Sequence, residues 1–185
     1  MIELNFSPFP VLNSQRLILR QLIPDDAGEV FAIRTEPSIS RYINRALYQS
    51  IEQAHDFINK RNDDIKNNKW LYWGITLKGV NKVIGTACIW NISKENFRAE
   101  VGYELMPEFQ GRGLMQEALV ALIDYSFKIV GLHSLEAVVH PDNAASIGLL
   151  ERNSFVREAL FKENVFFNAR FMDTAIYSLV NNNPT

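Results

Sequence analysis

Residues 100–122 read EVGYELMPEFQGRGLMQEALVAL and carry the strongest structural signal in the chain. The first part of this stretch alternates like a β-strand, and Pro107 ends the alternation. A short loop with two glycines follows, Gln110-Gly111-Arg112-Gly113. Apolar residues then recur at the spacing of one helix face, at Met115, Ala118, Leu119, Leu122 and Ile123. The sequence therefore predicts a strand, a glycine loop and the start of a helix in direct succession.

This succession is typical of a phosphate-binding site. The first turn of a helix leaves backbone N–H groups without partners, and the helix dipole adds partial positive charge there. Glycines let a pyrophosphate approach the backbone closely, and Arg112 adds a cation beside the loop. An ordinary strand, turn and helix without a ligand has the same pattern, so the loop alone leaves both interpretations open.

The residues around the loop exclude two common phosphate motifs. A Walker A loop requires Lys followed by Ser or Thr after its last glycine, where this chain has Leu114 and Met115. A dinucleotide fingerprint requires three glycines, and only Gly111 and Gly113 are present. If the loop binds a phosphate, its ligand therefore belongs to another class.

The composition predicts one globular domain over residues 1–185, because 47% of the residues are hydrophobic. The formal net charge is −2 without a long basic run, and no apolar stretch approaches a membrane span, so we expect neither nucleic acid nor membrane as a partner. A lone cysteine, Cys88, and three histidines without metal-ligand spacing predict no disulfide and no metal. The N-terminus lacks the pattern of a signal peptide, so we expect a cytoplasmic protein.

The remaining patterns predict an α/β fold. We expect strands over residues 16–22, 71–77, 83–90, 98–106, 135–140, 155–160 and 171–179, and helices beginning near residues 24, 38, 50, 114 and 143. Short turns join the three middle strands, so these should be antiparallel neighbours. The strands on either side of the glycine-loop helix form a βαβ unit and should be parallel. The prediction is a mixed, mostly antiparallel central sheet with helices on both faces.

Three stretches resemble the GCN5-related N-acetyltransferase (GNAT) family, in particular its RimJ/RimL-like ribosomal-protein-alanine N-acetyltransferase branch. They are SQRLILRQL at 14–22, AEVGYELMPEFQGRG at 99–113 and HPDNAASIGLLERNSF at 140–155. Gln110 and Gly113 match the family loop, Gln/Arg-x-x-Gly-x-Gly/Ala, whereas Met115 replaces its last small residue. Ser154 stands where the family usually has Gly, so a left-handed backbone there costs roughly 1 kcal/mol. The resemblance covers nearly the whole chain and implies the GNAT fold, with its parallel βαβ unit at the cofactor cleft.

The resemblance implies acetyl-CoA as the co-substrate. Its pantetheine would enter like an extra strand between the two parallel strands and contact the backbone of Leu105 and Met106. A backbone N–H near Met106 would polarise the thioester carbonyl. The pyrophosphate would bind backbone N–H groups of the loop, formed by Gln110, Gly111, Arg112, Gly113, Leu114 and Met115. The side chain of Arg112 is either a phosphate contact or a solvated loop residue.

Asn143 and Ser146 belong to the start of the helix that follows the second parallel strand. Asn143 is either an N-cap or a hydrogen-bond partner of the pantetheine amide. The resemblance places the Ser146 hydroxyl beside the CoA sulfur, to protonate it or to hydrogen-bond it, and its alternative is a second capping role. Many relatives carry a tyrosine at the position of Leu150, which has no proton to give, so Ser146 is the donor that we expect.

Glu100 is the candidate general base for the attacking amine. It shares a strand face with Gly102 and Glu104, and its alternative is a surface or paired carboxylate. Glu104 is unusual, because relatives often have an aromatic or apolar residue at that position. Glu163 lies near the position of an acid in RimL-like enzymes but is not aligned with it.

We therefore predict an acetyl-CoA-dependent N-acetyltransferase that moves an acetyl group to a primary amine. The resemblance suggests a protein N-terminal amine of the ribosomal-protein type. A small amine, such as a polyamine, amino acid or antibiotic, is the alternative acceptor, and a non-catalytic acyl-CoA-binding module is the alternative class. The sequence is compatible with a monomer or a homodimer.

Overall fold

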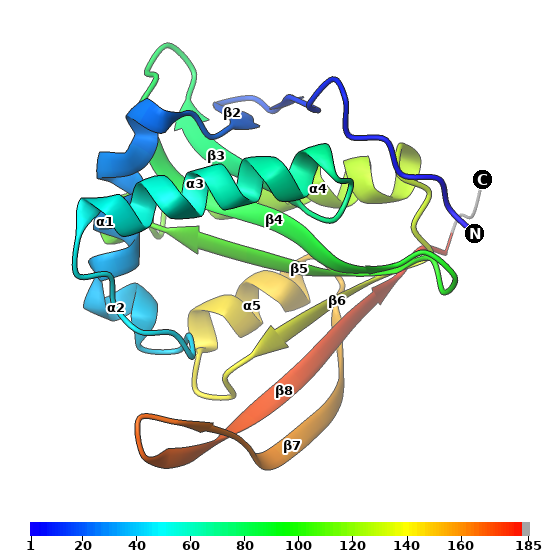
Figure 1. The fold of residues 1–185 in the computed structure, drawn as a ribbon. Coiled ribbons are helices and arrows are strands. Elements are labelled where there is room, and N and C mark those ends of the chain that lie inside the picture. The colour runs from blue at the N-terminus through cyan, green and yellow to red at the C-terminus, as the bar shows by residue number, and fades with distance from the viewer. Residues whose placement is uncertain (183–185) are drawn as a thin grey trace.

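An eight-stranded sheet runs through the computed structural model, which describes residues 1–182 (Figure 1). The strand order is β1-β2-β3-β4-β5-β6-β8-β7, and only β5 and β6 are parallel among these neighbouring pairs. The strands are β1 (Leu12–Asn13), β2 (Leu17–Gln21), β3 (Leu71–Leu77), β4 (Val83–Ser93), β5 (Arg98–Leu105), β6 (Ser134–Val139), β7 (Val156–Phe167) and β8 (Arg170–Val180). The predicted α/β fold, with a mostly antiparallel sheet and one parallel pair, is confirmed.

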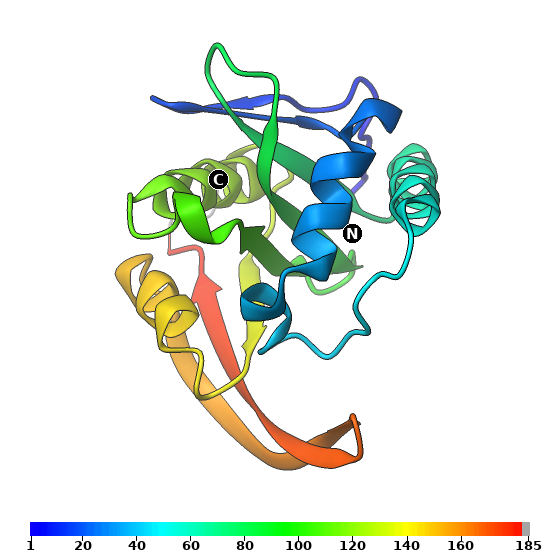
Figure 2. The ribbon, with the colours of Figure 1, turned by 90° about the vertical axis from the view of Figure 1, so that its left-hand side faces the viewer.

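Helices cover both faces of the sheet, as the view in Figure 2 shows. They are the 3₁₀ turns η1 (Pro24–Asp26) and η2 (Pro107–Phe109) and the helices α1 (Ala27–Thr35), α2 (Pro37–Ser40), α3 (Ile51–Lys66), α4 (Leu114–Lys128) and α5 (Ala144–Arg152). The first three α-helices lie on one face, and α4 and α5 lie on the other (Figures 1 and 2). The chain thus forms three layers, with the sheet in the middle.

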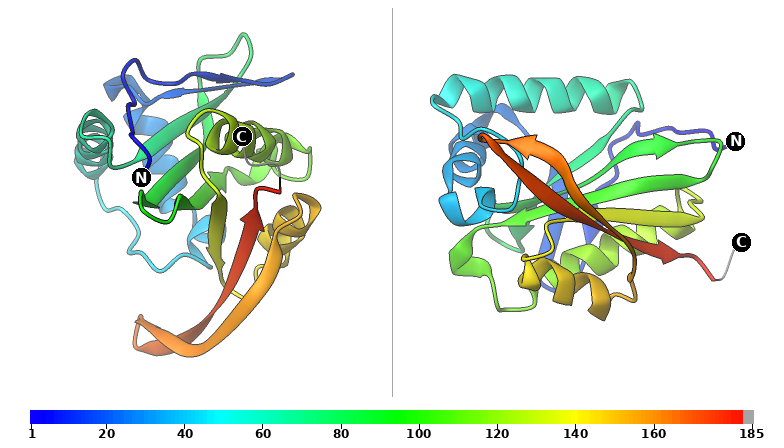
Figure 3. Two further views of the ribbon diagram at one scale, coloured as in Figure 1. Left: turned by 90° about the vertical axis from the view of Figure 1, so that its right-hand side faces the viewer. Right: turned by 90° about the horizontal axis from the view of Figure 1, so that it is seen from below.

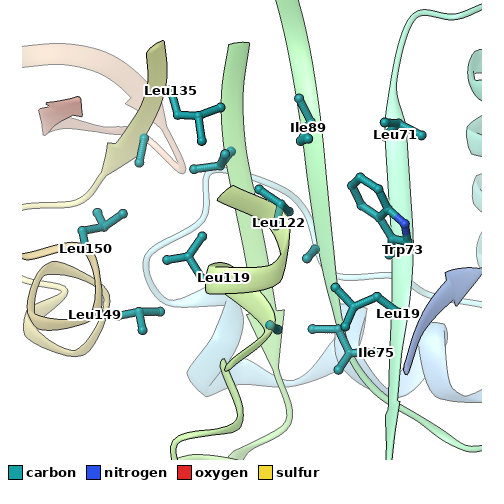
Figure 4. Packing of buried hydrophobic residues seen from close by; sticks show 14 of the residues in the cluster. Leu19, Leu71, Trp73, Ile75, Ile89, Leu119, Leu122, Leu135, Leu149 and Leu150 are labelled. Carbon is teal, nitrogen blue, oxygen red and sulfur yellow. The ribbon is translucent and has the colours of Figure 1, made fainter. Parts of the chain in front are cut away.

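Each face of the sheet has its own apolar core. Leu119 and Leu122 of α4 pack with Leu149 of α5 over strand residues that include Trp73 (Figure 4). On the opposite face, α1 and α3 pack on a second cluster that contains Cys88. Each fully buried leucine contributes about 1.5–3 kcal/mol, so these clusters fix the position of α4, whose N-terminus carries the glycine loop.

The parallel pair β5–β6 is joined over a short distance only. Residues 98–100 pair with residues 134–136, and the described pairing ends there, although β5 continues to Leu105. The two strands diverge beyond that point, and α5 lies beside the opening (Figure 1). The second half of β5 therefore presents one backbone edge to a gap instead of to a neighbouring strand.

The structure corrects several predicted boundaries. The two-residue strand β1 was not predicted, because so short a segment has no readable alternation. The helix predicted near residue 24 begins as a 3₁₀ turn, and the helix predicted to begin near residue 38 is a short one over Pro37–Ser40. β7 continues well past residue 160, because it pairs with β8 in a long curved hairpin (Figure 3).

Ser154 has the left-handed backbone that its position in the family pattern predicts. Its φ is 65°, in the turn between α5 and β7. A side chain in this region costs roughly 1 kcal/mol relative to glycine.

Candidate active site

A cleft of about 940 Å³ opens where β5 and β6 separate. Both strands, the glycine loop, the first turn of α5 and the segment between α2 and α3 border it. The predicted site residues that line it are Glu100, Leu105, Gln110, Gly111, Gly113, Leu114, Met115, Asn143 and Ser146. The fold therefore brings the glycine loop, the candidate base and the candidate proton donor to one cavity.

The conformation of the glycine loop explains its two glycines. Gly111 and Gly113 have φ angles of +71° and +72°, a backbone conformation that residues with a side chain rarely adopt. Gly113 is the N-cap of α4, so the loop delivers the free N–H groups of the first helical turn to the cleft. The Arg112 guanidinium lies 5.9 Å from the ring centre of Phe109 and does not line the cleft.

Two hydrogen bonds fix the loop to its surroundings. The Gln110 side-chain amide donates to the carbonyl of Leu105 over 2.7 Å, which holds the loop at the end of β5. Arg16 donates from Nη1 to the carbonyl of Arg112 over 3.0 Å. The loop is thus held at both ends by groups outside α4.

The backbone of Met106 does not face the cleft. Its N–H donates to the carbonyl of Ile84 over 3.0 Å, and its carbonyl accepts from the N–H of Phe109 over 3.0 Å. This corrects the predicted thioester contact at Met106, because that N–H already has a partner. Backbone groups of successive strand residues point to opposite edges, so the N–H groups of Tyr103 and Leu105 point to the gap instead.

Glu100 lies half-buried on β5, opposite Trp90 on one side and Glu136 on the other. Burial disfavours its charged form and Glu136 adds negative charge, and together they raise the pKa of Glu100 to about 7 despite a hydrogen bond from Asn91. Arg98 forms an ion pair with Glu136. A carboxylate with a pKa near neutrality suits a general base, because it is both available and basic enough to take a proton.

Ser146 lies across the gap, in the first turn of α5. Its N–H donates to the Asn143 side chain over 3.1 Å, so Asn143 has the N-cap contact that was one of its two interpretations. The Ser146 hydroxyl is 2.8 Å from the hydroxyl of Tyr103, and both residues line the cleft. Sequence analysis did not identify Tyr103; the signal available was its strand face, which is opposite to that of Glu100.

Two arginines reach the side of the cleft that holds Glu100. Arg45 donates two hydrogen bonds to the Glu104 carboxylate, over 2.5 and 2.7 Å, which explains the unusual acid on β5. Arg34 of α1 donates to the Tyr72 hydroxyl over 3.1 Å and lies 4.1 Å from the ring centre of Phe57. Neither arginine was identified from the sequence, because their neighbours are remote in the chain.

Three other side chains with reactive groups have structural surroundings that need no catalytic role. Cys88 is buried, and burial raises the pKa of its thiol to about 12, in agreement with the predicted core position. The His140 ring packs 5.5 Å from the ring of Tyr42 at the edge of the cleft. The N–H of Glu163 donates to Asp173 within the β7–β8 hairpin, and Glu163 does not line the cleft.

Two negative findings apply to residues 1–182. No group of three or more His, Cys, Asp or Glu side chains in this range is arranged to hold a metal ion. No helix in the same range has both the length and the apolar character that crossing a membrane requires.

Comparison with known proteins identifies the class of this enzyme. Residues 16–156 match the acetyltransferase (GNAT) domain. The chain is 34% identical over 172 residues to the uncharacterized N-acetyltransferase YoaA of Bacillus subtilis, with 93% of this chain and 97% of that protein covered. The protein therefore belongs to the GNAT family and is an N-acetyltransferase.

Relatives with named acceptors are more distant. The chain is 30% identical over 176 residues to the [ribosomal protein uS5]-alanine N-acetyltransferase of Escherichia coli, with 91% and 89% of the two chains covered. It is 27% identical over 162 residues to the spermidine N(1)-acetyltransferase of Vibrio cholerae, with 88% and 91% covered. A ribosomal-protein-S5-alanine acetyltransferase structure from Vibrio fischeri superimposes with a TM-score of 0.84 at 24% identity, with 95% and 99% covered. This likeness confirms the predicted GNAT fold.

Proposed function

We propose that this N-acetyltransferase moves the acetyl group of acetyl-CoA to the N-terminal amine of a protein, and that acetyl-CoA binds in the gap between β5 and β6. One observation carries the proposal. The gap has Glu100, with its raised pKa, on one side and the Ser146 hydroxyl on the other. A base for the amine and a donor for the leaving thiolate therefore face one cavity from opposite sides.

The cleft offers contacts along the whole length of such a cofactor. The N–H groups of Tyr103 and Leu105 point to the gap and can pair with the pantetheine amides as a neighbouring strand would. The loop over residues 110–115 presents the first-turn N–H groups of α4 to the pyrophosphate. Asn143 begins α5 beside the same gap, where its side-chain amide can donate to pantetheine while its oxygen caps the helix.

The residues of the cleft divide the chemistry among them. Glu100 takes the proton that the amine loses as its nitrogen attacks the acetyl carbon. The N–H of Leu105 binds the oxygen on which negative charge develops. When the carbon–sulfur bond breaks, the sulfur leaves with the electron pair, and the Ser146 hydroxyl donates a hydrogen bond that stabilises this thiolate while keeping its own proton. Because the amine, the thioester and these groups meet in one cavity, transfer needs no acyl-enzyme.

The charges around Glu100 favour a peptide over a polyamine. A polyamine carries several positive charges and is recognised by several free carboxylates. Here Glu104 is already paired with Arg45, and Arg34 adds a second cation to the same side of the cleft. An acceptor with one amine and a polar backbone suits these walls better, because it brings less positive charge to the two arginines.

The test is acetyl-CoA-dependent release of CoA over a panel of acceptors, with mass spectrometry of the products. The panel contains peptides with free N-termini, the same peptides with blocked N-termini, spermidine and free amino acids. We expect kcat/KM to be highest for free N-termini and acetylation to fall on the α-amine. Preferred turnover of spermidine or of an amino acid would contradict the peptide assignment, and tight CoA binding without any transfer would favour an acyl-CoA-binding module.

A further inference from the structure

Tyr103 and Ser146 form a hydroxyl pair in the wall of the cleft. Their oxygens are 2.8 Å apart, and they come from β5 and α5, which lie on either side of the gap. A serine hydroxyl has one proton, and the hydrogen bond can run in either direction. If Ser146 donated its proton to Tyr103, it would have none left for a thiolate. The direction of this bond therefore decides what Ser146 can do.

We infer that Tyr103 is a positioning residue for acetyl transfer, because its phenol donates to Ser146 Oγ and thereby directs the Ser146 proton to the CoA sulfur. The inference rests on the proposed function, since it requires CoA in the gap. It deepens that function, because it assigns the orientation of the Ser146 hydroxyl to a side chain outside α5. No proton is transferred between the two hydroxyls; Tyr103 only orients and polarises its neighbour.

The surroundings of the pair favour this direction. A phenol is far more acidic than a serine hydroxyl, so it is the better donor and the serine oxygen the better acceptor. Burial raises the pKa of Tyr103 to about 12, against the opposing effect of the bond to Ser146, so the phenol keeps its proton at neutral pH. The backbone N–H of Ser146 is already fixed by Asn143, which leaves the hydroxyl proton as the free donor of this residue.

The side chain at position 150 of α5 is consistent with the same assignment. Leu150 is buried in the core and has no hydroxyl, so α5 itself supplies no second donor there. Tyr103 instead brings a second hydroxyl to Ser146 from β5. The two hydroxyls at this point of the cleft therefore come from one strand and one helix.

The kinetic test combines the Tyr103→Phe and Ser146→Ala variants with the most active peptide acceptor. Ser146→Ala should lower kcat by about 10²-fold, at the low end for general acid assistance. Tyr103→Phe should lower kcat by about 10-fold, as expected for the loss of one neutral hydrogen bond, with KM for acetyl-CoA unchanged. Because Tyr103 acts through Ser146, the double variant should be no slower than Ser146→Ala alone.

The matched control is Tyr125→Phe, which removes a half-buried phenol that packs on Trp73, away from the cleft. This variant should keep the parent rate. Multiplied losses in the double variant, or a parental rate in Tyr103→Phe, would overturn the inference. Thermal denaturation of each variant shows whether a loss reflects unfolding, and the phenylalanine retains the ring that packs in the core.

A second readout needs no acceptor at all. The ultraviolet absorbance of the CoA thiolate, followed during a pH titration of the complex, reports how strongly the protein stabilises the bound thiolate. Both Tyr103→Phe and Ser146→Ala should stabilise the bound thiolate less than the parent does, so the thiol of bound CoA should titrate at a higher pH in each variant. An unchanged titration in Tyr103→Phe would contradict the positioning role. If the titration shifts as expected but no peptide is acetylated, the peptide assignment fails while the role of Tyr103 stands.

Discussion

At the scale of single residues, Glu100 combines two effects that oppose its own ionisation. It is partly removed from water in the cleft wall, and it lies directly across from Glu136. Glu136 is itself ion-paired with Arg98. The consequence is a carboxylate whose affinity for protons suits catalysis at neutral pH and whose ionisation opposes folding.

Replacement of Glu100 by Gln should remove the acidic limb of the pH–rate profile. In the parent, kcat/KM should fall as the pH drops below about 7, because protonated Glu100 cannot accept the proton of the amine. In Glu100→Gln, kcat should fall by about 10²-fold or more, and acetyl-CoA affinity should be kept. Steady-state kinetics from pH 5 to 9 measure both effects. A variant with parental turnover would leave Glu100 as a structural carboxylate.

The same substitution should make the protein more stable at alkaline pH. The pKa of Glu100 is raised from 4.5 to about 7 in the folded state, so the folded protein binds this proton more tightly than the unfolded chain. Stability is therefore lost as the pH rises from about 4.5 to about 7. We expect Glu100→Gln to raise Tm relative to the parent at pH 8 and to change it little at pH 4.5. The exposed Glu95→Gln serves as control, and equal Tm curves for Glu100→Gln and the parent would contradict the expectation.

At the scale of elements, a polar clamp joins the start of β2 to the first turn of α4. The Glu117 carboxylate accepts from the Ser14 hydroxyl over 2.6 Å and from Arg16, at its backbone N–H and at Nε, over 2.5 and 2.7 Å. These bonds outweigh the effect of burial and lower the pKa of Glu117 to about 2. Arg16 also holds the carbonyl of Arg112, so the clamp fixes the glycine loop without lining the cleft.

Loss of this clamp should weaken cofactor binding at a distance. Glu117→Gln should cost about 1 kcal/mol of stability, as for one lost cap or hydrogen bond, and raise the Kd of acetyl-CoA several-fold. The matched control is Asp124→Asn, which removes an exposed 2.8 Å ion pair with Lys128 at the other end of α4. Calorimetry should find the parental Kd for the control only. An unchanged Kd for Glu117→Gln would mean that the loop keeps its shape without the clamp.

The pH dependence of the clamp has the opposite sign to that of Glu100. The pKa of Glu117 is lowered by folding, so its stabilising effect is present above pH 4.5 and is lost as the pH falls toward about 2. Between about pH 4.5 and pH 2, Glu117→Gln should therefore lose less free energy of unfolding than the parent does. Denaturant titrations at pH 6 and pH 3 measure it, and the parent and the variant should differ less at the lower pH.

Elements with a local signal were predictable from the sequence. The glycine loop and the helix after it follow from two glycines and a helical apolar face, and the face of Glu100 follows from strand alternation. The Met106 N–H was wrongly predicted to face the gap, because the backbone edge that faces the gap depends on the register with β4. Strand register is set by packing and pairing across the sheet, so the sequence of one strand does not determine it.

Contacts between remote segments were not predictable. The pairs Tyr103–Ser146 and Arg45–Glu104 each join residues more than forty positions apart, and no local pattern marks them. The length of β7 was likewise underestimated, because its strand character comes from pairing with β8. Folding decides these features through tertiary contacts, whereas single-segment patterns report only local preference.

At the scale of the whole molecule, the sheet consists of two parts joined by a short parallel ladder. Strands β1 to β5 form one part, and β6, β8 and β7 form the other. Only residues 98–100 of β5 pair with β6, so a ligand that fills the gap beyond them would complete the sheet. Side chains of β5 alternate, so Glu100 and Tyr103 face opposite layers of helices.

Acetyl-CoA should therefore stabilise the entire fold and protect particular backbone amides. At a concentration 100 times its Kd, a ligand of the folded state adds about 2.7 kcal/mol, which should appear as a higher Tm. Hydrogen exchange at the N–H groups of Tyr103 and Leu105 should slow on binding, whereas Met106, already bonded to Ile84, should change least. Equal responses at Leu105 and Met106 would contradict the assignment of the gap-facing edge.

The burial of Cys88 has a practical consequence for the study of this protein. It is the only cysteine among 185 residues; the residue is 8% exposed, and its thiol has a pKa of about 12. A reagent that detects thiols should therefore stay silent toward the folded enzyme and respond to released coenzyme alone. Cys88 also borders the cleft, so with no coenzyme present the slow labelling of its thiol should report local opening beside the cleft, without any engineered probe.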